Sequence, residues 1–338
     1  MKWHVIRAAS CLGGITLWLM LVLQWDMGLL IFWHILIALV PALIIFAPGL
    51  WRNICPMATS ASIVSALTPY KKIQLSVASQ HRLAVAATLS LLLIVPLRHF
   101  IFDHFSIATA SLLGIAACIA MIGALAFYDK SAWCAGLCPI HPVEKFYGIA
   151  PSTRFQNAQC SSCSRCVKTC PDAIKTPQHL QPEHSTAQEK LMVSGFPGFV
   201  LGWFMIEDVP YDHLWQGIAM AYGYPALGML LSMSLFKVIK SRLNEPQHRV
   251  QIKVFIALTA IIYYWYTAPI LIHMLEILLS LRMTSSANNL PLFIIWPIRI
   301  GLSSLLFWWL VIRKPQRRTW LDRPPAATFV LKHYNRVN

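Results

Sequence analysis

The sequence predicts an all-α polytopic membrane protein with about eight transmembrane helices and a small cytoplasmic segment between the fourth and fifth. Three observations lead to this fold class. The 338 residues are 57% hydrophobic and only 12% charged, whereas soluble domains carry roughly 25% charged residues. Eight apolar runs have about the length that crosses a bilayer as a helix. The positive charges fall between these runs in an asymmetric pattern.

The eight predicted spans divide into two halves. They cover about residues 8–25, 28–50, 83–102, 107–127, 192–206, 214–236, 254–279 and 290–312. The fifth run is short and contains three glycines and a proline, so we expect it to be tilted, broken or re-entrant. The expected organisation is a four-helix half over 1–128, a cysteine-rich segment over 129–191, a second four-helix half over 192–312 and a basic tail over 313–338.

The loop charges predict the orientation. With the N-terminus in the cytoplasm, 25 of the 28 Lys and Arg residues lie on the cytoplasmic side, and only Arg98, Arg282 and Arg299 lie at or near the other side. This positive-inside pattern favours an even number of spans, with both termini and the cysteine-rich segment in the cytoplasm of a bacterial inner membrane. The net charge of +15 then reflects orientation and attraction to anionic membrane lipid, and we expect no nucleic-acid partner.

The strongest motif in the chain is a run of four cysteines. Cys160, Cys163, Cys166 and Cys170 are followed by a proline in the spacing C-x2-C-x2-C-x3-C-P. This is the bacterial ferredoxin run that binds a 4Fe–4S cluster through thiolates. Zinc sites usually pair two separated C-x2-C hooks, so the spacing favours iron and sulfide over zinc.

Two further Cys-Pro pairs follow predicted spans two and four. Cys55 precedes a proline and comes four residues after Trp51, while Cys134 and Cys138 are four apart and a proline follows Cys138. Together with the ferredoxin run, these motifs resemble the membrane-bound polyferredoxins of the NapH and NosR type over about residues 50–171. The pair at Cys55 matches the family's Cys-x3-Cys-Pro motif only in half, because Trp51 stands where the first cysteine would be.

The cysteine count leaves two arrangements open. Seven cysteines are predicted at the cytoplasmic level, whereas two cubane clusters would need eight thiolates. In the first arrangement the ferredoxin run holds one cluster alone, and Cys55, Cys134 and Cys138 have another purpose or are buried packing residues. In the second, Cys170 crosses to a second cluster, and Cys138 or Cys55 completes the first. The second cluster then has an open iron or a non-cysteine ligand, for which His141 is the nearest candidate and His81 and His179 are alternatives. We expect one cluster and favour a second.

Ionisable residues near the outer side form another candidate site. His34, His99 and His273 lie in predicted spans two, three and seven, and Glu276 follows His273 by three residues. Ionisable groups inside a membrane are functional candidates. They are interpreted as ligands of haem b, as proton acceptors in a quinol site, or as interfacial residues with their polar tips in the headgroups. Haem is the weakest of these interpretations.

These features favour a membrane-bound electron-transfer protein. We expect electrons to pass between the quinone pool, or a partner at the outer face, and a redox partner protein by way of the cytoplasmic cluster. The chain would work in a larger complex and, if it is an enzyme, as an oxidoreductase. Two alternatives remain: a redox maturation factor that supplies electrons for the assembly of a metalloenzyme, and a cluster-dependent membrane enzyme with an open iron site.

Overall fold

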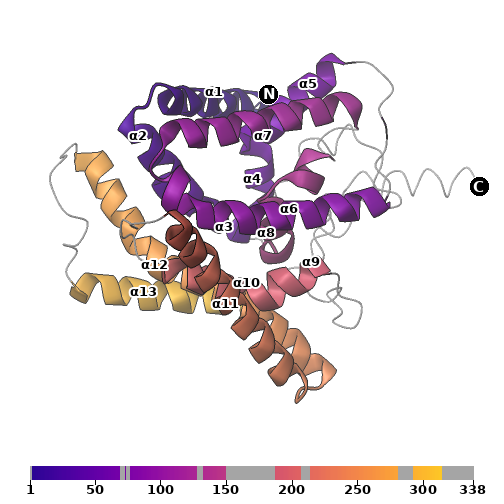
Figure 1. Cartoon of the computed structure of the whole chain (residues 1–338), viewed down its shortest axis with the longest axis vertical. Coiled ribbons are helices and arrows are strands. Elements are labelled where there is room, and N and C mark those ends of the chain that lie inside the picture. Colours follow the sequence, from indigo (N-terminus) through magenta and orange to yellow (C-terminus); the bar gives the residue numbers. More distant parts are fainter. Residues whose placement is uncertain are drawn as a thin grey trace, which may run out of the picture.

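The computed structural model describes residues 2–68, 73, 77–127, 132–149, 187–206, 214–280 and 292–313. Throughout these residues the secondary structure is helical, apart from one isolated parallel bridge between Ile73 and Phe127. The predicted ferredoxin run at 160–170 and the basic tail after Arg313 lie outside the described residues. The described part of the chain confirms an all-α architecture (Figure 1).

Seven helices in the described part are long and apolar enough to cross a membrane. They are α1 (Lys2–Val22), the run of α2 (Asp26–Leu29), η1 (Leu30–Leu36) and α3 (Ile37–Phe46), the run of α6 (Val77–Leu97) and η2 (Arg98–Phe102), α7 (Ser106–Ala126), α11 (Leu214–Lys240), α12 (Glu245–Ser280), and α13 (Leu292–Phe307) with η6 (Trp308–Ile312). Labels with η denote π-helical turns. These helices indicate a multi-pass membrane protein.

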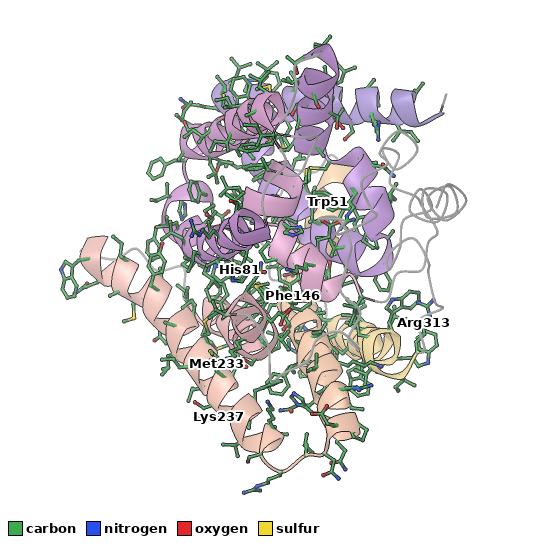
Figure 2. The ribbon with its side chains drawn as sticks, turned by 90° about the vertical axis from the view of Figure 1, so that its right-hand side faces the viewer. Trp51, His81, Phe146, Met233, Lys237 and Arg313 are labelled. Carbon is green, nitrogen blue, oxygen red and sulfur yellow. The ribbon has the colours of Figure 1, made fainter. Side chains whose placement is uncertain are left out.

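Large apolar side chains cover the outside of these helices, which agrees with a lipid environment. On α11, Leu230 and Leu231 are both 63% exposed. This helix projects from the rest of the molecule together with α12, and Met233 and Lys237 mark its path toward the connecting turn (Figure 2). In water such a surface would associate with other apolar surfaces, whereas a bilayer accepts it without cost.

The fifth predicted span is shorter than the other seven. Residues 187–204 form α9 (Ala187–Glu189), η5 (Lys190–Gly195) and α10 (Phe196–Phe204), which are not among the seven helices long and apolar enough to cross a membrane. Most of this segment is buried, including Met192 at 0% exposure, while Leu201 is 40% exposed. The segment therefore packs mainly against other helices.

Glycines in this short segment allow α10 and α11 to pack backbone against backbone. A Cβ atom added at Gly198 would collide with the carbonyl oxygen of Gly228, and one added at Gly202 would collide with that of Tyr224. Small residues spaced four apart permit such close approach between membrane helices. The glycines that suggest a broken span in the sequence are thus the contact surface for α11.

The largest core cluster ties the short segment to the cysteine-bearing part of the chain. It contains Phe146 and Tyr147 of α8 (His141–Tyr147), together with residues of α10 and α12. The Tyr147 hydroxyl donates a hydrogen bond to the carbonyl of Met192 at 2.8 Å and lies 3.1 Å from Thr259 Oγ1. This packing fixes α8 only a few residues after Cys138.

The helices place the described Cys-Pro pairs and the segment with Arg98 and His99 in two different regions of the bundle. Near the start of α1, the Ser10 hydroxyl donates to the carbonyl of Ile54, next to Cys55. Farther along α1, Leu17 packs in one cluster with Trp33 of η1, and Trp33 donates to the carbonyl of Phe102 in η2. We call these regions the cysteine end (Cys55, Cys134, Cys138) and the arginine end (Arg98, His99, Asp103).

Candidate functional site: two cysteine-proline bends and an arginine-capped cavity

The cysteine end is built from two bends with the same backbone conformation. Cys55 joins α4 (Pro48–Ile54) to α5 (Pro56–Leu67) with φ −60° and ψ 121°. Cys138 follows η3 (Trp133–Leu137) with φ −61° and ψ 123°. A proline disfavours helical backbone in the residue before it. Each Cys-Pro pair therefore ends one helix and turns the chain toward the next.

Hydrogen bonds in the two bends show which residues correspond. In the first bend the Cys55 amide donates to the carbonyl of Trp51 at 3.0 Å, and in the second the Cys138 amide donates to that of Trp133 at 2.9 Å. Trp51 thus corresponds to Trp133, and not to Cys134 as the spacing of the sequence motif suggests. The second bend closes over one more residue because it is a π turn, and π turns occur frequently at functional sites.

The two bends lie against each other. Ala61 of α5 and Trp133 of η3 are buried in one hydrophobic cluster, and Cys134 and Cys138 pack against it. Burial and, to a smaller degree, negative charge on Cys55 raise the pKa of the Cys138 thiol to about 12. Without a metal ion, Cys138 is therefore a protonated thiol at neutral pH.

A buried ion pair joins the segments that carry the bends. Arg52, three residues before Cys55, donates through Nε to the carboxylate of Glu144 in α8. Their side chains are only 10% and 7% exposed. Burying both charges requires that they remain paired, so this contact fixes α4 relative to α8.

The three described thiols do not by themselves make up a metal site. Cys55, Cys134 and Cys138 are not in disulfide bonds, and no three His, Cys, Asp or Glu side chains within the described ranges are grouped as a metal site. His141 is buried beside the second bend, and its amide donates to the carbonyl of Cys138 at 3.0 Å. Thiols are ligands that suit iron. A complete set of ligands for an iron–sulfur cluster would need residues from outside the described part. Cys160, Cys163, Cys166 and Cys170 lie there.

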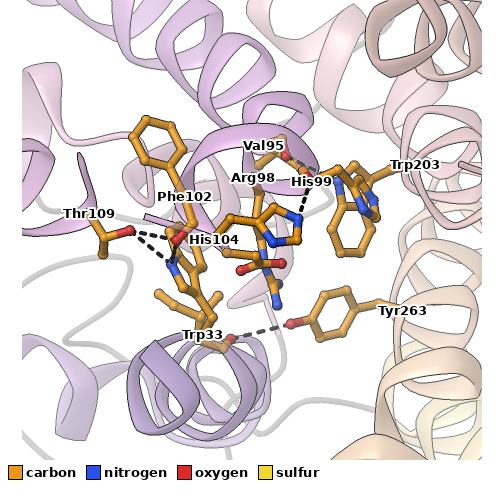
Figure 3. A network of polar contacts seen from close by, with 11 residues as sticks. Trp33, Val95, Arg98, His99, Phe102, His104, Thr109, Trp203 and Tyr263 are labelled. Carbon is orange, nitrogen blue, oxygen red and sulfur yellow. Dashed lines mark hydrogen bonds and ion pairs between the residues drawn. The ribbon is translucent and has the colours of Figure 1, made fainter. Parts of the chain in front are cut away.

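At the arginine end, a charged pair is enclosed by tryptophans (Figure 3). Arg98 Nε lies 2.8 and 2.9 Å from the two carboxylate oxygens of Asp103. The guanidinium carbon lies 4.9 Å from the ring centroid of Trp33 and 5.3 Å from that of Trp203. His99 also stacks near Trp203, with ring centroids 4.7 Å apart. Sequence reasoning identified His99 but missed the two tryptophans, which are apolar residues with no motif.

Indole and hydroxyl hydrogen bonds hold this end in place. Trp33 Nε1 donates to the carbonyl of Phe102 at 2.9 Å, and Thr109 donates to the same oxygen at 2.7 Å. Trp203 Nε1 donates to the carbonyl of Val95 at 3.1 Å. Phe102 is the last residue of η2, and carbonyl groups in the last turn of a helix have no intrahelical partner and are available to side-chain donors.

A cavity of about 170 Å³ lies between the two ends. Trp33, Arg98, Trp203 and Tyr263 line one part of it, while Ile140, Val143 and Tyr147 line another. Ile140 is the second residue after Cys138. The sequence did not predict this cavity, because its walls come from five segments that are distant along the chain.

The remaining predicted histidines occupy separate places. His34 lies in η1, where it is half-buried, and His273 lies in α12, ten residues beyond Tyr263. Ten helical residues correspond to about 15 Å along the axis. The side chain of Glu276 is outside the described residues. Neither His34 nor His273 lines the cavity.

Comparison with known proteins does not place the chain in a family. No protein-family model, no curated protein and no solved structure matches it. The resemblance to the NapH and NosR type therefore stays a prediction from the motifs.

Proposed function

We propose that this protein is a membrane-bound iron–sulfur electron-transfer protein of the NapH and NosR type. It passes electrons between the quinone pool, or a partner at the outer face, and a redox partner by way of a cytoplasmic 4Fe–4S cluster. The observation that carries this proposal is the C-x2-C-x2-C-x3-C-P run at 160–171 in a chain with seven membrane-length apolar helices.

In this proposal the ferredoxin run and the two bends share the cluster ligands. Cys160, Cys163 and Cys166 bind the first cluster, and a bend cysteine completes it. Cys170 and the remaining bend cysteines then bind a second cluster. The supporting geometry is that Cys138 and Cys55 are close enough to interact electrostatically and that both have nearly the same φ and ψ before a proline. A bound cluster supplies one-electron oxidation and reduction, while the protein positions it and sets its surroundings.

We also propose that both termini are cytoplasmic, which requires an even number of crossings. The short segment 187–204 would supply the eighth. Its packing mainly against other helices supports this role, because a short span with Lys190 and Glu189 at its start can cross where it is shielded from lipid. The distribution of 25 of 28 Lys and Arg residues on one side gives the direction. Accessibility of single cysteines introduced before α1 and after η6 tests it.

The primary test is the content of iron and acid-labile sulfide in protein purified without oxygen. We expect about eight iron atoms per chain, as two cubanes require, and no haem in a pyridine haemochrome assay. Cys163→Ser should remove the iron of at least one cluster, whereas Cys118→Ser on the exposed face of α7 should remove none. Unchanged iron in Cys163→Ser would overturn the proposal.

Reduction by quinol separates this function from a maturation role. An electron-transfer protein should show reduction of its cluster when a soluble quinol analogue is added. The electron paramagnetic resonance signal of the cluster measures this reduction. A maturation factor should show no such reaction and should instead be needed for the metal content of a partner enzyme.

A further inference from the structure

The cavity between the cysteine and arginine ends extends along the bundle. The part of its wall formed by η1 and α3 runs from Trp33 to Ile45. These residues are twelve positions apart, which corresponds to about 18 Å along a helix. Ile140 and Tyr147 line its part near the cysteine end, and Arg98 lines its part at the arginine end. The cavity therefore extends from the arginine end to the residues that follow Cys138.

The size and lining of the cavity select an apolar occupant. Aliphatic and aromatic side chains make up nearly all of its wall. Apolar cavities of about 150 Å³ remain dry and bind benzene-sized molecules. A volume of about 170 Å³ thus accommodates one six-membered ring or a short length of hydrocarbon chain.

Arg98 places hydrogen-bond donors at one end of this apolar space. A guanidinium has five N–H donors, and Asp103 accepts only from Nε. The Nη groups donate to none of the residues that the structure describes. Trp33 and Trp203 enclose the guanidinium on its faces, so these donors are directed by the packing and are not free to turn toward lipid.

We propose that the cavity binds the uncharged, apolar ring or chain of a membrane amphiphile. An oxygen atom at one end of this ligand accepts hydrogen bonds from Arg98. Two membrane components have this chemistry, an isoprenoid quinone and an acyl lipid. This binding site rests on the proposed function in one respect. A quinone bound here would lie between the arginine end and the Cys138 bend. It would then bridge part of the roughly 30 Å that an electron must cross.

Tryptophan fluorescence provides a test that does not depend on electron transfer, because Trp33 and Trp203 line the cavity. Decyl-benzoquinone is the quinone probe and decanoic acid the acyl probe. We expect saturable quenching of tryptophan fluorescence by decyl-benzoquinone in the purified full-length protein. Displacement of the quinone by decanoic acid at similar concentration would assign the site to acyl chains, and failure of displacement would assign it to the quinone ring.

Two cavity-filling variants and one control connect the signal to this site. Ala260→Phe and Val143→Phe each add a ring to the cavity wall, and we expect at least tenfold weaker binding in both. Leu258→Phe adds the same ring on the same helix at a side chain 39% exposed, and should change binding less than twofold. Arg98→Lys keeps the charge beside Asp103 but loses the forked donors, and should weaken binding about fivefold.

The outcomes separate this inference from the proposed function. Binding that does not saturate, or that is equal in Ala260→Phe, Val143→Phe and Leu258→Phe, overturns the cavity assignment. Iron content should be the same in all these variants, because none changes a cysteine. Conversely, unchanged iron in Cys163→Ser would refute the cluster while leaving the quenching experiment interpretable.

Discussion

The two Cys-Pro bends have the same backbone conformation at the cysteine but differ in the number of thiols they carry. Cys55 and Cys138 differ by only one or two degrees in φ and ψ, since the following proline restricts both in the same way. Yet the second bend contains an additional thiol, Cys134, within its π turn. The comparison shows that a helical turn closing over one more residue keeps the backbone angles of the Cys-Pro bend and places an additional thiol in the turn.

The largest expected effect comes from separating the two bends. Arg52→Met removes the guanidinium that pairs with the buried carboxylate of Glu144, and breaking a buried pair by removing one partner costs about 3–5 kcal/mol of folding free energy. We expect a corresponding fall in the thermal unfolding midpoint in detergent. The double variant Arg52→Met with Glu144→Met removes both charges and should recover most of the stability. If the double variant is no more stable than the single one, the pair does not fix the bends.

Removing one thiol from each bend tests whether both bends hold iron. Cys138→Ser and Cys55→Ser should each lower the iron content by up to four atoms per chain, the content of one cubane. Cys11→Ser, on α1 and outside both bends, is the matched control and should retain all iron. Equal iron in Cys55→Ser and Cys11→Ser would mean that only the second bend is a ligand site.

Adding a thiol to the first bend sharpens the correspondence between the two. Trp51→Cys restores the Cys-x3-Cys-Pro spacing, but the hydrogen bonds align Trp51 with Trp133 and not with Cys134. We therefore expect no gain of iron in this variant, measured on protein purified without oxygen. A gain of iron would show that sequence spacing describes the site better than the backbone hydrogen bonds do.

The smallest expected effect is on cysteine reactivity in iron-free protein. Burial raises the pKa of Cys138 from the ordinary 9.0 to about 12, and the thiolate is the form that reacts. Its alkylation rate by iodoacetamide should therefore keep rising about tenfold per pH unit between pH 9 and 11, where an ordinary thiol has levelled off. Mass spectrometry of the modified peptide measures this rate. A plateau near pH 9 would contradict the burial of Cys138.

The membrane helices were predictable because their signal is local. An apolar run of sufficient length crosses a bilayer whatever its neighbours are, and seven of the eight predicted runs form such helices. The run at 192–206 was harder to interpret, because its glycines serve contacts with Gly228 and Tyr224. Those partners are more than twenty residues away, and sequence spacing does not reveal a contact between two backbones.

Candidate ligands were also predictable from local patterns, while their surroundings were not. The prolines after Cys55 and Cys138 marked the ends of helices, as found. The ion pair between Arg52 and Glu144 joins residues 92 positions apart, and no periodicity in the sequence connects them. The histidine hypothesis similarly included His99 but missed its neighbour Trp203.

By itself, the sequence determined the class of the protein, the positions of its long helices and the cysteines that are candidate iron ligands. Each of these depends on properties of short segments, namely hydropathy over one helix, the restriction that proline imposes and the spacing of thiols. Only the tertiary structure decided that the two bends meet, that Arg98 is held between Trp33 and Trp203, and that a cavity lies between the two ends. These features arise from side-chain packing among distant segments, which is set by shape complementarity in three dimensions.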